Sequence, residues 1–158
     1  MSVKLRALVV DDSGVMRKMV MRSLQQADLA EFEFTEAQDG CDALTKFKES
    51  SFEIAFIDWN MPNMTGIDLV REIRSYEREN GFSRIPLIMV TSEKTMGKMQ
   101  EALDEAGADA YIAKPFTVAD LQGKLRKVVA LAKKIAEGGG ARKVAARSGS
   151  GLLGRLFG

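Results

Sequence analysis

Short apolar runs alternate along the chain with longer segments in which apolar residues recur at helical spacing. The runs at 5–10, 54–57 and 86–90 are almost continuously apolar, which is typical of strands covered on both faces of a parallel sheet. The alternation therefore predicts an α/β fold with helices on both sides of the sheet. The predicted strands are 5–10, 33–37, 54–57, 86–90 and 110–113, and the predicted helices are 14–27, 40–49, 66–79, 95–106 and 118–136.

This pattern ends near residue 137, where the composition changes. Three glycines, Gly138–Gly140, end the last predicted helix and favour a flexible linker. Half of the chain's 14 glycines lie in residues 138–158, and this segment has too little apolar surface for a core of its own. We therefore expect one domain over residues 1–136 and a glycine- and arginine-rich tail over 137–158 that is disordered unless a ligand binds it.

The charge of the chain is unevenly distributed, although its composition, with 46% hydrophobic and 28% charged residues, is ordinary. From Lys124 to Gly158 nine basic residues stand against one acid, Glu137, so this stretch carries +8. Because the net charge of the whole chain is +1, the remainder carries −7. The asymmetry predicts an anionic partner for the C-terminal stretch.

The chain has one cysteine and no histidine. Cys41 has no partner for an internal disulfide, which indicates a reducing cytosol, and we expect it to be a small buried apolar side chain. The missing histidine removes the commonest zinc ligand and the usual general base. We also find no signal peptide and no apolar stretch near the ~20 residues that span a membrane. We therefore expect a cytoplasmic protein.

Polar side chains follow four of the predicted strands. Asp11 and Asp12 follow the first, Asp58 the third, Thr91 the fourth and Lys114 the fifth. Ligands of open parallel sheets bind beyond the carboxyl ends of the strands, so these side chains are expected at one site. Converging carboxylates repel one another, and a hard divalent cation such as Mg²⁺ removes that repulsion.

The same set of residue types suits phosphoryl transfer. A carboxylate can act as a nucleophile and form an acyl phosphate, and Asp58 stands alone at its strand end. Asp11 and Asp12 suit a metal ion, while Lys114 and Thr91 suit the charge of a phosphoryl group. Each residue also has a structural explanation, such as an N-cap or a turn. Their joint occurrence at four strand ends favours the site.

Four motifs at these strand ends resemble the receiver domain of two-component response regulators, and the CheY-like group in particular. The resemblance covers about residues 4–136 and implies a flavodoxin-like doubly wound sheet of five parallel strands in the order 2-1-3-4-5, with five helices and a cis Lys114–Pro115 bond. The motifs are Val9-Val10-Asp11-Asp12-Ser13, Asp58-Trp59-Asn60-Met61-Pro62-Asn63-Met64-Thr65-Gly66, Met89-Val90-Thr91-Ser92-Glu93 and Ala110-Tyr111-Ile112-Ala113-Lys114-Pro115-Phe116.

The resemblance also implies roles for individual residues. A phosphoryl group on the acceptor would draw a threonine inward and a tyrosine after it, which reshapes the surface around the fourth and fifth helices. Such a domain assists only its own phosphoryl transfer and dephosphorylation, so we expect no enzyme of a diffusible substrate. The implied roles are Asp58 as phosphoacceptor, Asp11, Asp12, Asp58 and the Asn60 carbonyl as Mg²⁺ ligands, Lys114 as phosphoryl contact, and Thr91 with Tyr111 as switch pair.

The tail resembles the arginine-rich extension of the Cle family, CheY-like proteins that respond to cyclic di-GMP. Arg142 and Arg147 flank a short Lys-Val-Ala-Ala stretch, and a Ser-Gly-Ser-Gly stretch follows. Arginine matches guanine in shape and hydrogen bonding, and serine can donate to phosphate. The resemblance implies that Arg142, Arg147 and Arg155 bind the nucleotide with help from Ser148 and Ser150.

Two functions remain open at this point. In the first, cyclic di-GMP orders the tail and the protein docks on a FliM-like flagellar switch protein, at the flagellated pole, to modulate motility and surface attachment. In the second, a histidine kinase drives a chemotaxis regulator or phosphate sink, and the tail is an incidental basic terminus. We identify no second domain after the receiver, so output is expected through binding. The apolar residues Leu152, Leu153, Leu156 and Phe157 would form one face of a helix that docks on a partner or a membrane.

Overall fold

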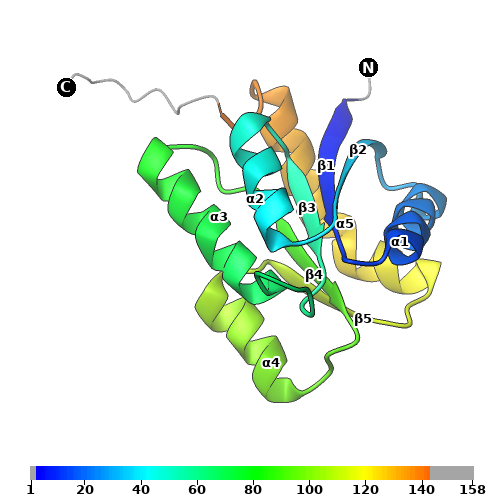
Figure 1. Cartoon of the computed structure of the whole chain (residues 1–158). Helices are drawn as coiled ribbons and strands as arrows, with labels where there is room; N and C mark the ends of the chain where they lie inside the picture. The colour runs from blue at the N-terminus through cyan, green and yellow to red at the C-terminus, as the bar shows by residue number, and fades with distance from the viewer. Residues whose placement is uncertain (1–2, 143–158) are drawn as a thin grey trace.

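A five-stranded parallel sheet forms the middle layer of the computed structural model, which describes residues 3–142 (Figure 1). The strand order, β2-β1-β3-β4-β5, confirms the order implied by the sequence motifs. Every residue of β3 and β4 is buried, as their continuous apolar character predicts. The strands are β1 (Lys4–Val10), β2 (Glu31–Ala37), β3 (Ile54–Ile57), β4 (Leu87–Thr91) and β5 (Ala110–Ala113).

Helices cover both faces of this sheet, and each face has its own apolar core. Buried residues of α1 and α5 pack on one face, and those of α2, α3 and η1 pack on the other (Figure 1). In the described part of the chain, no helix is both long and apolar enough to cross a membrane. The helices are α1 (Gly14–Ala27), α2 (Gly40–Glu49), α3 (Gly66–Asn80), α4 (Met96–Gln100), η1 (Glu101–Ala106) and α5 (Val118–Glu137).

Five helices begin at a side chain that accepts a hydrogen bond from a backbone N–H of the first turn. Such caps satisfy groups that have no partner inside the helix, and each contributes about 1 kcal/mol. At α1 the cap is Ser13, whose side chain accepts from the Met16 amide, while its own amide donates to Oδ1 of Asp11 at 2.9 Å. The capping residues are Ser13, Asp39, Thr65, Thr95 and Thr117.

Two predictions from the sequence need correction. The helix predicted over 95–106 has a wide, π-helical second half, because the amides of Gly107 and Ala108 both reach back to the carbonyl of Ala102, at 3.2 and 2.9 Å. Cys41 is exposed rather than buried. It follows Gly40 at the start of α2. The buried positions of this helix are Gly40, Ala43 and Phe47, so Cys41 lies outside its buried face.

The chain does not leave the domain at the end of α5. Residues 138–142, which the composition had assigned to the tail, fold back onto the rim of the domain. Ala141 is 4% exposed and joins the core on the α2–α3 side, although α5 itself packs on the other face. Gly140 has a φ of +97°, and a Cβ there would lie 3.1 Å from a guanidinium nitrogen of Arg6. Glycine is therefore required where the segment crosses β1.

Gly66 and Gly123 are two helix glycines that together test how closely α3 packs against the end of β3. A Cβ on Gly66 would lie 1.9 Å from the carbonyl oxygen of Asp58, whereas a Cβ on Gly123 would meet nothing within 4 Å. We expect Gly66→Ala to lower the free energy of unfolding by about 3 kcal/mol or more. Gly123→Ala should raise it by about 0.5–1 kcal/mol. Urea unfolding of both variants measures this, and equal effects would contradict the packing described.

Candidate functional site

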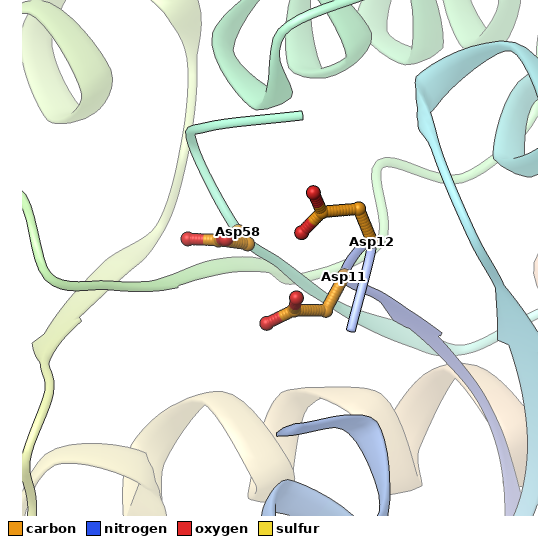
Figure 2. A group of neighbouring side chains, drawn as sticks. All are labelled: Asp11, Asp12 and Asp58. Carbon is orange, nitrogen blue, oxygen red and sulfur yellow. The ribbon is translucent and has the colours of Figure 1, made fainter. Parts of the chain in front are cut away.

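Three carboxylates gather where β1 and β3 end (Figure 2). One oxygen each from Asp11, Asp12 and Asp58 lies within 4.8 Å of the others. The two strands are neighbours in parallel register, with Val10 opposite Ile57, so the residues that follow them meet. Asp11 and Asp58 are buried and Asp12 is exposed. The structure thus brings together the acids that the sequence assigned to one site, here called the acid trio.

Lys114 lies at the same rim, as predicted. Its Nζ is 3.0 Å from Oδ2 of Asp11 and 3.8 Å from Oδ1 of Asp58, and its side chain is 12% exposed. The backbone N–H of Lys114 donates to the carbonyl of Thr91 at 2.8 Å, which places the residue just beyond β4 and β5. The bond from Lys114 to Pro115 is cis, as the motif implied. One ammonium group therefore bridges two of the three acids.

Burial dominates the ionisation of Asp58. It raises the pKa of this carboxyl above its ordinary value, and the nearby charge of Asp11 adds to the rise. The charge of Lys114 opposes the rise, as do hydrogen bonds from the Thr91 hydroxyl and the Trp59 amide. The amide of Trp59 donates to Oδ1 of Asp58 at 2.9 Å. Asp58 is thus a positioned, partly desolvated carboxylate, which suits a nucleophile.

The donor set of the site fits a hard divalent cation. Three carboxylates face one ammonium group, so negative charge is in excess, and all the donors are oxygen. Oxygen ligands of this kind suit Mg²⁺ rather than zinc. Asn60 follows Asp58 by two residues, and its side-chain amide donates to Glu93 at 2.7 Å.

Thr91 and Tyr111 lie on neighbouring strands and are linked through Glu93. The Thr91 side chain is fully buried, and its oxygen accepts a hydrogen bond from the Glu93 amide at 3.3 Å. The Tyr111 hydroxyl donates to the Glu93 carbonyl at 2.6 Å, and the tyrosine is 6% exposed. Burial raises the pKa of Tyr111 to about 12. Both residues of the predicted switch pair are therefore turned inward and tied to one loop.

Arg17 is a residue of the site that sequence reasoning missed. It donates from Nη1 to the carbonyl of Asp11 at 2.6 Å and from Nε to a carboxylate oxygen of Glu36 at 2.8 Å. Arg17 therefore connects the backbone between Asp11 and Asp12 to the end of β2. Its place four residues after the cap of α1 was the available signal, because that position turns back toward the strand end.

A second group of residues that sequence reasoning missed surrounds the loop after Asp58. The ammonium group of Lys98, on α4, lies 4.5 Å from the centre of the Trp59 ring. Such a cation–π contact ties α4 to the residue that follows Asp58. Together with the bond from Asn60 to Glu93, it joins the loop after β3 to the segment after β4. No spacing in the sequence relates these pairs, because they lie more than thirty residues apart.

The structure places one of the predicted nucleotide-binding residues. Arg142 lies beside the C-terminal end of α2, where its guanidinium donates to the carbonyls of Phe47 and Ser50. It is thus at the opposite end of β3 from Asp58. Arg147, Ser148, Ser150 and Arg155, and the apolar residues after position 151, lie outside the described residues.

Comparison with known proteins agrees with this geometry. Residues 7–126 match the sequence profile described as the response regulator receiver domain. The chain is 39% identical over 124 residues to the chemotaxis protein CheY of Pseudomonas aeruginosa, which covers 78% of this chain and 95% of that protein. It is 40% identical over 124 residues to CheY-3 of Vibrio cholerae, which covers 78% and 91%.

Solved structures give the same result. The chemotaxis response regulator CheY4 of Vibrio cholerae superposes with a TM-score of 0.67 at 34% identity, over 80% of this chain and 99% of that one. A CheY-like receiver domain from Methanospirillum hungatei superposes with a TM-score of 0.69 at 26% identity, over 84% and 98%. Both similarities cover most of this chain rather than all of it.

Arg17 offers a test of whether the backbone of the acid trio must be fixed for cation binding. Arg17→Lys keeps the positive charge but loses the fork that joins Asp11 to Glu36. We expect this variant to bind Mg²⁺ about tenfold more weakly, as is common when a second-layer contact is lost. Fluorescence of Trp59 during a Mg²⁺ titration measures the affinity. Arg22→Lys, on the exposed side of the same helix, is the control, and equal affinities in both variants would contradict a positioning role.

Proposed function

The chain belongs to the response regulator receiver domain family, and from that premise we propose that it is a CheY-like chemotaxis regulator that is phosphorylated on Asp58. The observation that carries the proposal is the meeting of the acid trio with Lys114 at one edge of the sheet. None of these residues is needed there for the core. Together with the Thr91 hydroxyl, they supply an acid, an ammonium and a hydroxyl group, which are the groups that hold a phosphoryl group.

Asp58 acts as the nucleophile in this mechanism. One of its carboxylate oxygens attacks the phosphorus of a phosphohistidine on a partner kinase, an O–P bond forms, and the P–N bond to the donor breaks. The electron pair of the broken bond stays on the imidazole. The amide of Trp59, bonded to Oδ1 at 2.9 Å, holds the carboxylate during the approach. Dephosphorylation transfers the phosphoryl group to water, which releases inorganic phosphate and regenerates the Asp58 carboxylate.

Mg²⁺ would be held by Asp11, Asp12, Asp58 and the backbone carbonyl of Asn60. When bound, it neutralises charge on the phosphoryl oxygens. The acid trio would supply its oxygen donors. A bound cation would also offset the charge of Asp11, which adds to the rise that burial causes in the pKa of Asp58.

Lys114 and Thr91 act on the phosphoryl group once it is attached. Lys114 lies 3.8 Å from Asp58 and supplies a positive charge to a phosphoryl oxygen, while the buried Thr91 hydroxyl donates to another. Tyr111 follows Thr91 because both are tied to Glu93. The reshaped surface of α4, β5 and α5 would then bind the flagellar switch protein, a partner suggested by the names of the chemotaxis relatives.

A second function is carried by the tail and is compatible with the first. We propose that cyclic di-GMP binds Arg142, Arg147 and Arg155, with Ser148 and Ser150 on its phosphates. The support is the charge of +8 from Lys124 onward and the pairing of arginine with small residues in one short stretch. The nucleotide would adjust docking on the motor and thereby surface attachment.

Phosphorylation can be tested with acetyl phosphate as a small donor. Asp58→Asn removes the nucleophile, so we expect no incorporation of the phosphoryl group, and removal of Mg²⁺ with EDTA should slow the wild type at least about a hundredfold. Mass spectrometry of the intact protein measures both. Asp104→Asn, an exposed acid on η1, should behave as wild type. Unreduced labelling of the Asp58 variant would rule out this acceptor.

Nucleotide binding can be tested by calorimetry with cyclic di-GMP on the full chain. Arg147→Ala should weaken binding at least about tenfold, since a guanine contact by arginine contributes roughly 1–3 kcal/mol. Arg126→Ala, on the exposed face of α5, keeps the same net charge as that variant and should bind as wild type. Absence of heat with micromolar cyclic di-GMP would remove the second function and leave the first untouched.

A further inference from the structure

A binding site for a guanidinium group lies at the C-terminal end of α2. One nitrogen of Arg142 donates to the carbonyl oxygens of Phe47 and Ser50, the latter at 2.7 Å. The guanidinium carbon lies 5.0 Å from the centre of the Phe82 ring and 5.9 Å from that of Tyr76. We call these four partners, Phe47, Ser50, Tyr76 and Phe82, the cradle.

The chemistry of the cradle suits arginine, and one of its rings also has a lysine beside it, since the ammonium group of Lys48 lies 5.4 Å from the centre of the Tyr76 ring. The last carbonyls of a helix have no partner inside it and carry the negative end of its dipole. A guanidinium is planar, so it can donate in its plane to carbonyls while its faces rest on aromatic rings. Lysine would supply only a point charge. The rim of α2 and α3 thus offers both kinds of contact that distinguish the two cations.

The segment before Arg142 is seated on the same rim. The Ser83 amide donates to the carbonyl of Ala141 at 2.8 Å, and the Ala141 side chain is buried in the core that includes Phe47. Gly140 crosses beside Arg6 with a φ that favours glycine. The first residues of the tail are therefore held by a backbone bond and an apolar contact at Ala141 and by the cradle at Arg142, so all three contacts act on two adjacent residues.

The hold on Arg142 is one that an anion can compete for. The cradle offers neutral carbonyls and rings, and none of the ion pairs in residues 3–142 includes Arg142. Hydrogen bonds from arginine to a phosphate are stronger than those to neutral carbonyls. A ligand with two phosphates can therefore form stronger hydrogen bonds with the Arg142 side chain than the cradle can.

We propose that the cradle and the ligand of the tail are alternative partners of one guanidinium. With Arg142 in the cradle, residues 138–142 are closed onto α2 and α3. With Arg142 on the ligand, that segment is released from the rim. This inference rests on the proposed nucleotide binding. Only the open form can use all the arginines. The apparent affinity for the ligand therefore equals the affinity of the open form multiplied by the fraction of molecules that are open.

Weakening the cradle without touching the tail tests the competition. Phe82→Leu in the full chain keeps apolar bulk but removes one ring from beneath the guanidinium. We expect cyclic di-GMP to bind this variant about threefold more tightly, because more Arg142 is free. Arg142→Ala should bind it more weakly than wild type. Phe34→Leu, which removes a ring on the other face of the sheet, is the matched control and should leave the affinity unchanged.

Hydrogen exchange at the Ser83 amide reports the release directly. Its partner is the carbonyl of Ala141, so exchange should speed up by about tenfold or more when cyclic di-GMP is added, and also in Arg142→Ala without ligand. The amide of Ile85, in the same loop, donates to Glu77 at 2.9 Å and should not change.

The outcomes distinguish failure of this competition from failure of the proposed nucleotide binding. If cyclic di-GMP binds, but Ser83 exchange and the affinity of Phe82→Leu both stay at wild-type values, the competition is overturned and nucleotide binding stands. If the wild type gives no heat with cyclic di-GMP, the proposed nucleotide function fails, and the competition falls with it. Tighter binding by Phe82→Leu together with faster Ser83 exchange supports it.

Discussion

The mutual repulsion of three carboxylates at one edge of the sheet is the constraint on which the rest of this structure depends. Parallel pairing of β1 with β3 places Asp11, Asp12 and Asp58 together, and the amide of Asp58 donates to the Val10 carbonyl at 2.9 Å. A single ammonium, Lys114, offsets part of that charge. The site is therefore an electrostatically unfavourable arrangement that the core imposes and that a bound cation would relieve, which is the physical basis of the phosphoryl chemistry proposed for it.

Much of this arrangement could be predicted because it follows from local rules. Continuous apolar runs predicted buried parallel strands, and the carboxyl ends of such strands meet, which located the acid trio, Thr91 and Lys114. The contacts of Arg17 and Lys98 could not be found this way, since they depend on which way a helix faces. Cys41 was assigned from the average behaviour of cysteine, and its place at the start of α2 decided otherwise. The glycines after residue 137 predicted a flexible linker. In the structure, Gly140 instead adopts a positive φ that lets residues 138–142 pack against the domain.

The acid trio and the cradle lie at opposite ends of β3. Asp58 follows its last residue, while Ser50, in the cradle, precedes its first. A phosphoryl group on Asp58 and the Arg142 guanidinium in the cradle would therefore act on the domain without touching each other. Any coupling between them must pass through the sheet or the helices around it, and the two proposed functions can operate in one molecule.

Titration of the full chain with Mg²⁺, followed by the amide NMR signals of residues 11–13, 58–60 and 83, tests the central claim most directly. A shared cation predicts that the signals after β1 and after β3 shift together along one saturation curve with a single dissociation constant, while Ser83 stays still. Shifts confined to one of the two segments, or two different constants, would contradict the claim that the acid trio holds a single ion.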